Sequence, residues 1–162
     1  MKRRVIAILL FALCLSSFVS CSDEPEVDMS YRHAYCEIAF NLPTDYANMP
    51  SDTFDALFTN GQATVGITRL SFAGIEGDDL DGSMFPDTVA RKYAEKNELD
   101  VTFTDKTDHT YFEYRDGGYY NLIAFYRSKY AHFIVRFTCT TEKKGEYAQD
   151  FVRFAAEARF TQ

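Results

Sequence analysis

Tryptophan is absent from this 162-residue chain, and histidine, with three residues, and cysteine, with four, are scarce. Tryptophan is well suited to stacking on a sugar ring, so its absence disfavours a glycan-binding platform. His33, His109 and His132 share no spacing that would bring their rings onto one metal, and neither Cys-x-x-Cys nor His-Glu-x-x-His occurs. We therefore expect solvated or strand-edge histidines, and we predict no metal and no other cofactor.

The common motifs of nucleophilic catalysis and phosphate binding are missing as well. Gly-x-Ser-x-Gly, Gly-x-x-x-x-Gly-Lys-Ser/Thr and Gly-x-Gly-x-x-Gly do not occur in the sequence. A catalytic triad is defined by its geometry and not by its spacing, so a hydrolase of envelope material stays as the least favoured hypothesis. The sequence predicts a protein that is not an enzyme.

Basic residues are few. The chain has 17 lysines and arginines against 24 aspartates and glutamates, which gives a formal net charge of −7. Three of the basic residues, Lys2, Arg3 and Arg4, lie at the extreme N-terminus, so the rest of the chain is still more acidic. Such a chain is repelled by phosphate backbones, and we predict that it does not bind nucleic acid.

The only extended apolar run lies at the N-terminus, between Val5 and Leu15, after the basic residues. It is shorter than the about 20 residues of a transmembrane helix, and its flanks are typical of a signal peptide. We predict that residues 1–20 are removed and that Cys21, then the first residue, receives a diacylglycerol, as in bacterial lipoproteins. Ordinary secretion with an unmodified Cys21 is the alternative, because Phe18 stands where lipoprotein signals usually have leucine.

Residues 21–32 are expected to form a flexible tether. Their first part, Ser22-Asp23-Glu24-Pro25-Glu26, is polar, acidic and contains proline, so it cannot pack into a core. It resembles the acidic segment that marks surface-exported lipoproteins of Bacteroidota. We therefore expect a protein held in the outer membrane through its lipid at Cys21, with exposure at the cell surface left open.

Two cysteines lie in the part of the chain that is expected to fold. An even pair in an exported protein suggests a disulfide between Cys36 and Cys139. Each cysteine shares its strand parity with apolar residues, so two separately buried thiols are the alternative. The sequence alone does not give the Cα separation that would decide between them.

The apolar pattern predicts six strands and three helices, and residues 33–162 are expected to form one domain. The strands are expected at residues 33–42, 62–72, 100–104, 110–115, 119–127 and 132–140, and the helices at about 51–60, 86–97 and 146–160. Asp116-Gly117-Gly118 predicts a tight hairpin, and Gly66 inside its strand predicts a bulge or a close backbone approach. Both faces of the hairpin are apolar, so both need to be covered.

We therefore predict an α+β fold, an α/β/α sandwich with a central antiparallel sheet flanked by helices. The order of these elements resembles the PsbP-like superfamily, which includes DcrB-like lipoproteins. The resemblance lies in the Asn-Leu-Pro corner at Pro43, the helix that begins at Pro86, the Tyr-Tyr-Asn-Leu meander from Tyr119 and the closing amphipathic helix. It implies the sandwich architecture and an accessory binding role, but members of a fold do unrelated work.

Two surface features remain as candidates. The tyrosines at the hairpin end, Tyr114, Tyr119 and Tyr120, are a candidate contact surface, because tyrosine is favoured at protein interfaces. The acidic loop 76–82 is a weak Ca²⁺ candidate through Asp78, Asp79 and Asp81. Its spacing does not match an EF-hand, so a solvated loop is favoured.

The leading hypothesis is a lipid-anchored accessory protein of the cell envelope that is not catalytic and binds a protein partner. A binder of small ligands or glycans in a nutrient-uptake system is the alternative, and it requires a concave pocket of several hundred Å³ with a few converging polar groups.

Overall fold

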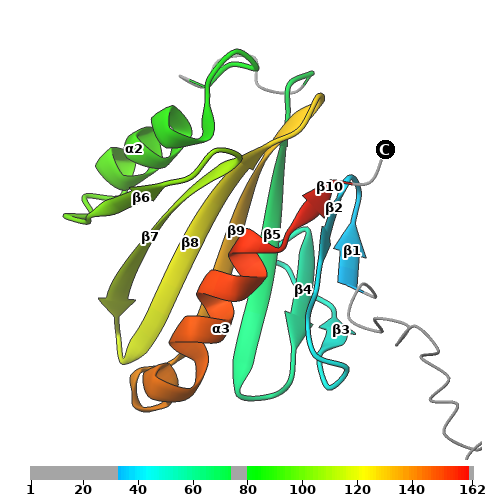
Figure 1. Cartoon of the computed structure of the whole chain (residues 1–162), viewed down its shortest axis with the longest axis vertical. Helices are drawn as coiled ribbons and strands as arrows, with labels where there is room; N and C mark the ends of the chain where they lie inside the picture. Colours follow the sequence, from blue (N-terminus) through cyan, green and yellow to red (C-terminus); the bar gives the residue numbers. More distant parts are fainter. Residues whose placement is uncertain (1–32, 74–79, 161–162) are drawn as a thin grey trace, which may run out of the picture.

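The computed structural model describes residues 33–73 and 80–160, which form two antiparallel sheets and two α-helices (Figure 1). The large sheet has seven strands in the order β3-β4-β5-β9-β8-β7-β6, and the small sheet has three in the order β1-β2-β10. The large sheet consists of β3 (Ala47–Met49), β4 (Ala56–Thr59), β5 (Ala63–Ser71), β6 (Phe103–Asp105), β7 (His109–Asp116), β8 (Tyr119–Arg127) and β9 (Ala131–Thr140). The small sheet consists of β1 (His33–Tyr35), β2 (Ile38–Phe40) and β10 (Arg159–Phe160), and the helices are α2 (Pro86–Lys96) and α3 (Lys144–Ala156).

The hairpin between β7 and β8 is confirmed. Asp116 pairs with Tyr119, and the two glycines between them have φ values of 55° and 87°. Both values lie in the left-handed region, which glycine enters at little cost, and a two-residue turn of this kind matches the twist of the strands.

Both faces of the large sheet are covered, so the predicted sandwich is confirmed. Phe151 and Phe154 of α3 pack on one face, against the side chains that β8 and β9 present there. Val89 and Ala90 of α2 pack on the other face, against Phe112 and its neighbours. Figure 1 shows that the small sheet lies beside α3, so that these two elements share one face. The fold is α+β, with one helix on each side of the sheet.

The predicted single strand over residues 33–42 is wrong. The chain turns at Cys36 and Glu37, and β1 and β2 pair with each other as a hairpin, with Tyr35 opposite Ile38. Cys36 has a φ of 49°, a left-handed value that allows this tight turn. The apolar residues of β2 are buried on both sides, so they do not show the alternation of a half-exposed strand.

The predicted helix after Pro50 is also wrong. Ser51 Oγ accepts hydrogen bonds from the amides of Thr53 and Phe54, at 3.1 and 3.0 Å, and so stabilises a turn and no helix. The residues that follow form β4, in which Phe58 pairs with Val65 of β5. Pairing with the neighbouring strand therefore outweighs the local helical pattern.

The remaining predicted elements are present and differ only at their ends, whereas β3 was not predicted. Helix α2 begins at Pro86, as predicted, while α3 ends at Ala156 and the next residues form β10 beside β2. Within the described residues, no helix is both long and apolar enough to cross a membrane.

Candidate functional site

An open groove of about 500 Å³ lies where the free edges of the two sheets face each other. It combines apolar side chains with a few polar ones and lies beside the N-terminal end of the described chain. Its lining comes from β1, β3, the turn after β3 and the start of β4: Ala34, Tyr35, Asn48, Met49, Pro50, Ser51, Phe54, Asp55 and Ala56. We call this surface the edge groove.

Two edge strands border the edge groove. Strand β1 is the last strand of the small sheet and β3 is the last strand of the large sheet, so among the described residues neither has a partner on its outer side. At one end the two strands are tied together, because the Nε2 atom of His33 lies 2.8 Å from the carbonyl oxygen of Tyr46. The ring of His33 also packs edge-on against Phe58, with 5.1 Å between ring centroids.

The apolar wall of the edge groove rests on Gly66. A Cβ atom at this position would lie 2.7 Å from the ring of Phe54, which is too close for any other residue without a shift of that ring. The guanidinium of Arg136 lies over the same ring, with its central carbon 5.9 Å from the ring centroid, in a cation–π contact. Met49, which also lines the groove, is 48% exposed. The bulge or close backbone approach predicted at Gly66 is wrong: the strand pairs regularly on both sides, and it is a side chain, the ring of Phe54, that lies close to Gly66.

The polar end of the edge groove is formed by Tyr35 and Asp55. Burial raises the pKa of Tyr35, and the hydrogen bond with Cys36 and the negative charge of Asp55 raise it further, while Arg69 acts in the opposite direction. Asp55 Oδ2 accepts a hydrogen bond from the amide of Arg69 at 2.7 Å, and the Asp55 amide donates to the carbonyl of Ile67 at 2.9 Å. The Asp55 carboxylate is therefore fixed in place and faces solvent.

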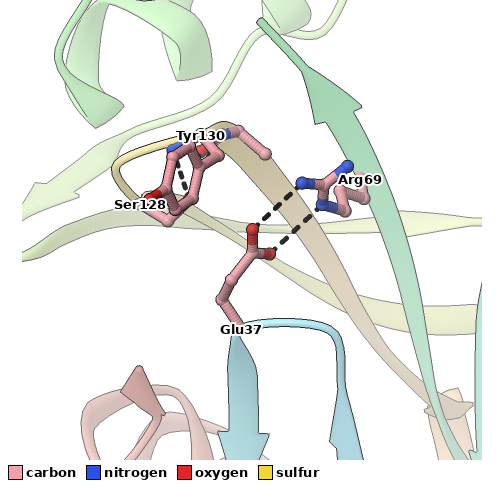
Figure 2. A network of polar contacts seen from close by, with 5 residues as sticks. Glu37, Arg69, Ser128 and Tyr130 are labelled. Carbon is pink, nitrogen blue, oxygen red and sulfur yellow. Dashed lines mark hydrogen bonds and ion pairs between the residues drawn. The ribbon is translucent and has the colours of Figure 1, made fainter. Parts of the chain in front are cut away.

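An ion pair lies next to this end and joins the two sheets (Figure 2). The Arg69 guanidinium donates to both carboxylate oxygens of Glu37, at 3.0 and 3.2 Å. The hydrogen bond from Arg69 holds the pKa of the Glu37 carboxyl below its usual value and raises that of Arg69. In Figure 2 the turn that carries Ser128 and Tyr130 lies above this pair.

The tyrosine surface predicted at the hairpin end is only partly exposed. Tyr120 is 1% exposed and stacks on Phe151 at 6.1 Å, so it belongs to the core and its inclusion was wrong. Tyr114 is half-buried, and burial raises its pKa. Tyr119, 53% exposed, is the one member that faces solvent.

The disulfide alternative for Cys36 and Cys139 is not realised. Glu37, next to Cys36, contacts Arg69 near one end of β5, whereas Cys139 pairs with Ala63 at the other end. These positions on β5 are about 20 Å apart, far beyond the reach of a disulfide. The Cys139 thiol is buried, which raises its pKa, but Cys36 is exposed because the turn breaks the expected parity.

The three histidines are buried, against the expectation of solvated or edge positions. His33, His109 and His132 are 5%, 3% and 1% exposed. His109 Nδ1 lies 2.7 Å from the Asp108 carboxylate, and His132 Nε2 lies 2.9 Å from the carbonyl of Asp81. Across the described ranges, no group of three or more histidine, cysteine or acidic side chains is placed to hold a metal.

The acidic loop is described only in part. Asp78 and Asp79 lie outside the described residues, as do Cys21, the predicted signal 1–20 and the tether 21–32. The Asp81 carboxylate accepts hydrogen bonds from the amide and the hydroxyl of Ser83, and these bonds lower its pKa. The carboxylate thus stabilises the local turn at residues 81–83. The adjacent Gly82 carbonyl accepts a hydrogen bond from Arg127 at 2.8 Å.

The edge groove was not predicted from the sequence. Its two borders, near residues 34 and 49, belong to two separate hairpins, β1–β2 and β3–β4, and the sequence does not show that these hairpins meet. The sequence signal that could have revealed it is Pro50: proline is confined to sheet edges and strand ends, so a strand that ends there is a candidate edge strand.

Comparison with solved structures shows the same architecture elsewhere. The solution structure of cyanobacterial PsbP (CyanoP) from Synechocystis sp. PCC 6803 matches with a TM-score of 0.57 and 10% identity, over 78% of this chain and 91% of that chain. A crystal structure from Bacteroides thetaiotaomicron VPI-5482 matches with a TM-score of 0.51 and 13% identity, over 77% of this chain and 45% of that one. No family model and no curated protein matches the sequence.

The PsbP-like fold is thus confirmed. At 10% and 13% identity the likeness concerns the fold alone. The lipoprotein character and the DcrB-like assignment stay predictions.

Proposed function

We propose that this chain is a lipid-anchored accessory protein of the cell envelope that is not catalytic and binds a protein partner at the edge groove. The observation that carries the proposal is the pair of free strand edges, β1 and β3, that border one groove. The groove also exposes the apolar side chain of Met49. Exposed apolar side chains beside unpaired strand edges are typical of sites where another chain binds.

The predicted tether supports this assignment. Residues 21–32 lead directly into β1, the strand that forms one border of the edge groove. A lipid at Cys21 would therefore hold the groove within a few nanometres of the membrane, because a flexible linker of n residues spans about 5–6 Å × √n. Partners embedded in the same membrane would then be favoured by their high local concentration.

Site-specific photo-cross-linking in living cells tests the partner. A photoreactive phenylalanine analogue at Met49 is expected to give one reproducible adduct with an envelope protein. The same analogue at Tyr119, which is similarly exposed on the β7–β8 hairpin, is the matched control and is expected to give none. No adduct from Met49, or the same adducts from both positions, would show that the edge groove is not the binding site.

Membrane partitioning tests the anchor separately. The Cys21→Ala variant is expected to move from the detergent phase to the aqueous phase, because the diacylglycerol supplies the membrane affinity. Retention of this variant in the membrane fraction would contradict lipidation as the cause of anchoring.

Small-ligand binding is the second candidate, favoured by the volume of the edge groove. Ligand sites commonly enclose about 300–1,000 Å³ and pair apolar walls with a few polar groups. Tyr35, Ser51 and Asp55 supply such groups here. A thermal-shift screen of peptides, sugars and apolar metabolites separates the two: stabilisation by small molecules alone, without a cross-linked protein, would favour this candidate.

A further inference from the structure

The proposal that follows rests on the proposed function and defines the chemistry of the partner. We propose that the edge groove takes an extended segment of the partner as an added β-strand, with a basic side chain beside Asp55 and an apolar one against Met49 and Phe54. The segment's backbone would lie between β1 and β3 and pair with both, while its side chains would fill the groove.

The backbone geometry is the first argument. Each border of the edge groove is a strand edge whose outer amide and carbonyl groups have no strand partner among the described residues. Each border strand has three residues, so it offers about 10 Å of edge. Three or four residues of an extended segment fit this length. The His33–Tyr46 contact closes one end and fixes where the segment must stop.

The charge of the groove is the second argument. The Glu37 carboxylate is neutralised by both of its hydrogen bonds to Arg69. Asp55 accepts a backbone amide from Arg69, but in the described part of the chain no lysine or arginine side chain forms an ion pair with it. The groove therefore presents one fixed and uncompensated carboxylate, which favours a lysine or arginine of the partner.

The same charge argues against two other occupants. The chain's own tether carries Asp23, Glu24, Glu26 and Asp28, and these carboxylates would be repelled by Asp55. A second copy would have to present its own edge strand, and among β1, β3, β6 and β10 only β10 contains a lysine or arginine. With two residues, Arg159 and Phe160, β10 is shorter than the three or four residues that fit the edge. A basic, apolar segment of another protein satisfies both the backbone and the charge.

Binding of synthetic peptides to the full chain, purified in detergent as cells produce it, tests this inference. The probe is the extended peptide acetyl-Lys-Val-Lys-Val-Lys-Val-amide with a fluorescent label. Its glutamate counterpart and a form with proline at the central valine are the matched peptides. We expect the basic peptide to bind, the proline form to bind roughly tenfold more weakly through lost backbone pairing, and the glutamate form not to bind.

Variants of the protein assign the site. Asp55→Asn keeps an oxygen that can accept the hydrogen bond from the Arg69 amide, and it is expected to lower the affinity for the basic peptide about fivefold. Asp52 is a nearby exposed carboxylate outside the groove lining, so Asp52→Asn is the control and should change that affinity by less than about twofold. Met49→Arg should also weaken binding, with Met49→Leu as its control. Hydrogen exchange at residues 33–35 and 47–49 should slow when the basic peptide is bound.

The outcomes separate this inference from the proposed function. Equal effects of Asp55→Asn and Asp52→Asn, or peptide binding without slower exchange in β1 and β3, would reduce the effect to non-specific attraction by an acidic protein and overturn strand addition. If Met49 still cross-links a partner in cells, the proposed function stands while its mode is wrong. Specific peptide binding without any adduct in cells would support the strand site and contradict the accessory role.

Discussion

The contact between Glu37 and Arg69 is the residue-scale link between the two sheets. The bond is bidentate, and the two side chains are 22% and 24% exposed, so water screens it less than it screens a fully exposed pair. It fixes the β1–β2 turn above β5 and so sets the position of one border of the edge groove. The small sheet is held in addition by the contact between His33 and Tyr46 and by the apolar packing of Ile38 and Phe40.

Replacement of Glu37 by glutamine is expected to lower the free energy of unfolding by about 1 kcal/mol at neutral pH. The Arg69 hydrogen bond depresses the Glu37 pKa in the folded protein, so its contribution is complete above the carboxyl's usual value of 4.5 and is lost as the pH falls through the depressed value. Urea unfolding of the two proteins between pH 7 and pH 3 measures this difference, which should shrink towards the acid end.

The control for this variant is Asp150→Asn, which removes an exposed pair with Arg153 within α3. Its effect should be about 0.3 kcal/mol. A Glu37→Gln penalty that is absent at pH 7, or that grows as the pH falls, would show that the ion pair does not hold the turn.

The thiols differ in exposure, which gives a second residue-scale prediction. A maleimide reagent is expected to modify Cys36 in the native protein and Cys139 only after unfolding, because burial protects that thiol and raises its pKa. Mass spectrometry of the Cys36→Ser and Cys139→Ser variants assigns each adduct. A reductant-sensitive link between the two cysteines would contradict the structure.

At the scale of elements, strand β4 is held in place by its fit against β5. Phe54, just before β4, lies on the bare backbone of Gly66, the residue that pairs with Leu57. This contact shapes the apolar wall of the edge groove as well as the sheet. One glycine therefore serves both the fold and the proposed site.

Gly66→Ala is expected to displace the Phe54 ring, to lower the free energy of unfolding by about 1–3 kcal/mol through overpacking, and to weaken the cross-link from Met49. Gly145→Ala is the matched control, since nothing lies within 4 Å of a Cβ there and alanine favours the helix. Thermal unfolding compares the two. Equal effects would mean that Phe54 does not depend on Gly66.

The long, alternating and well-bounded elements were predictable from the sequence, and the short ones were not. Periodicity and turn residues predict strands β5, β7, β8 and β9, helix α2 and the glycine hairpin. Because both faces of the sheet are apolar, helices on both faces were also predicted. The residues after Pro50 have a helical pattern, but pairing with β5 makes them a strand. The two-residue strand β10 is stabilised by distant β2, which local sequence does not reveal.

The candidate site depended on such distant contacts even more. Tyr120 follows the exposed Tyr119 in sequence but faces α3. The alternation along the strand puts the two side chains on opposite faces, but whether Tyr120 is buried depends on which face α3 covers. His109 is polar, yet it is buried between Tyr111 and Tyr126, with its ring stacked on both. The edge groove forms because the β1–β2 hairpin pairs with β10 in a separate small sheet and does not join the large sheet. No local sequence pattern specifies this choice of partner.

At the scale of the whole molecule, the two sheets leave their free edges together. In Figure 1 strands β1 and β3 lie on the same side of the molecule, away from α2 and β6. The opposite edge strand, β6, is covered in part by Arg91 of α2, which pairs with Asp105 at 3.1 Å. In the large sheet one edge, β6, is thus partly protected, while the other, β3, borders the edge groove together with β1 of the small sheet.

Hydrogen exchange on the complex with the partner isolated by cross-linking decides whether the edge groove is the binding site. Amides of residues 33–35 and 47–49 are expected to exchange more slowly in the complex, while those of the β7–β8 hairpin near Tyr119 do not change. Protection of that hairpin, with unchanged exchange in β1 and β3, would contradict the assignment of the edge groove as the binding site.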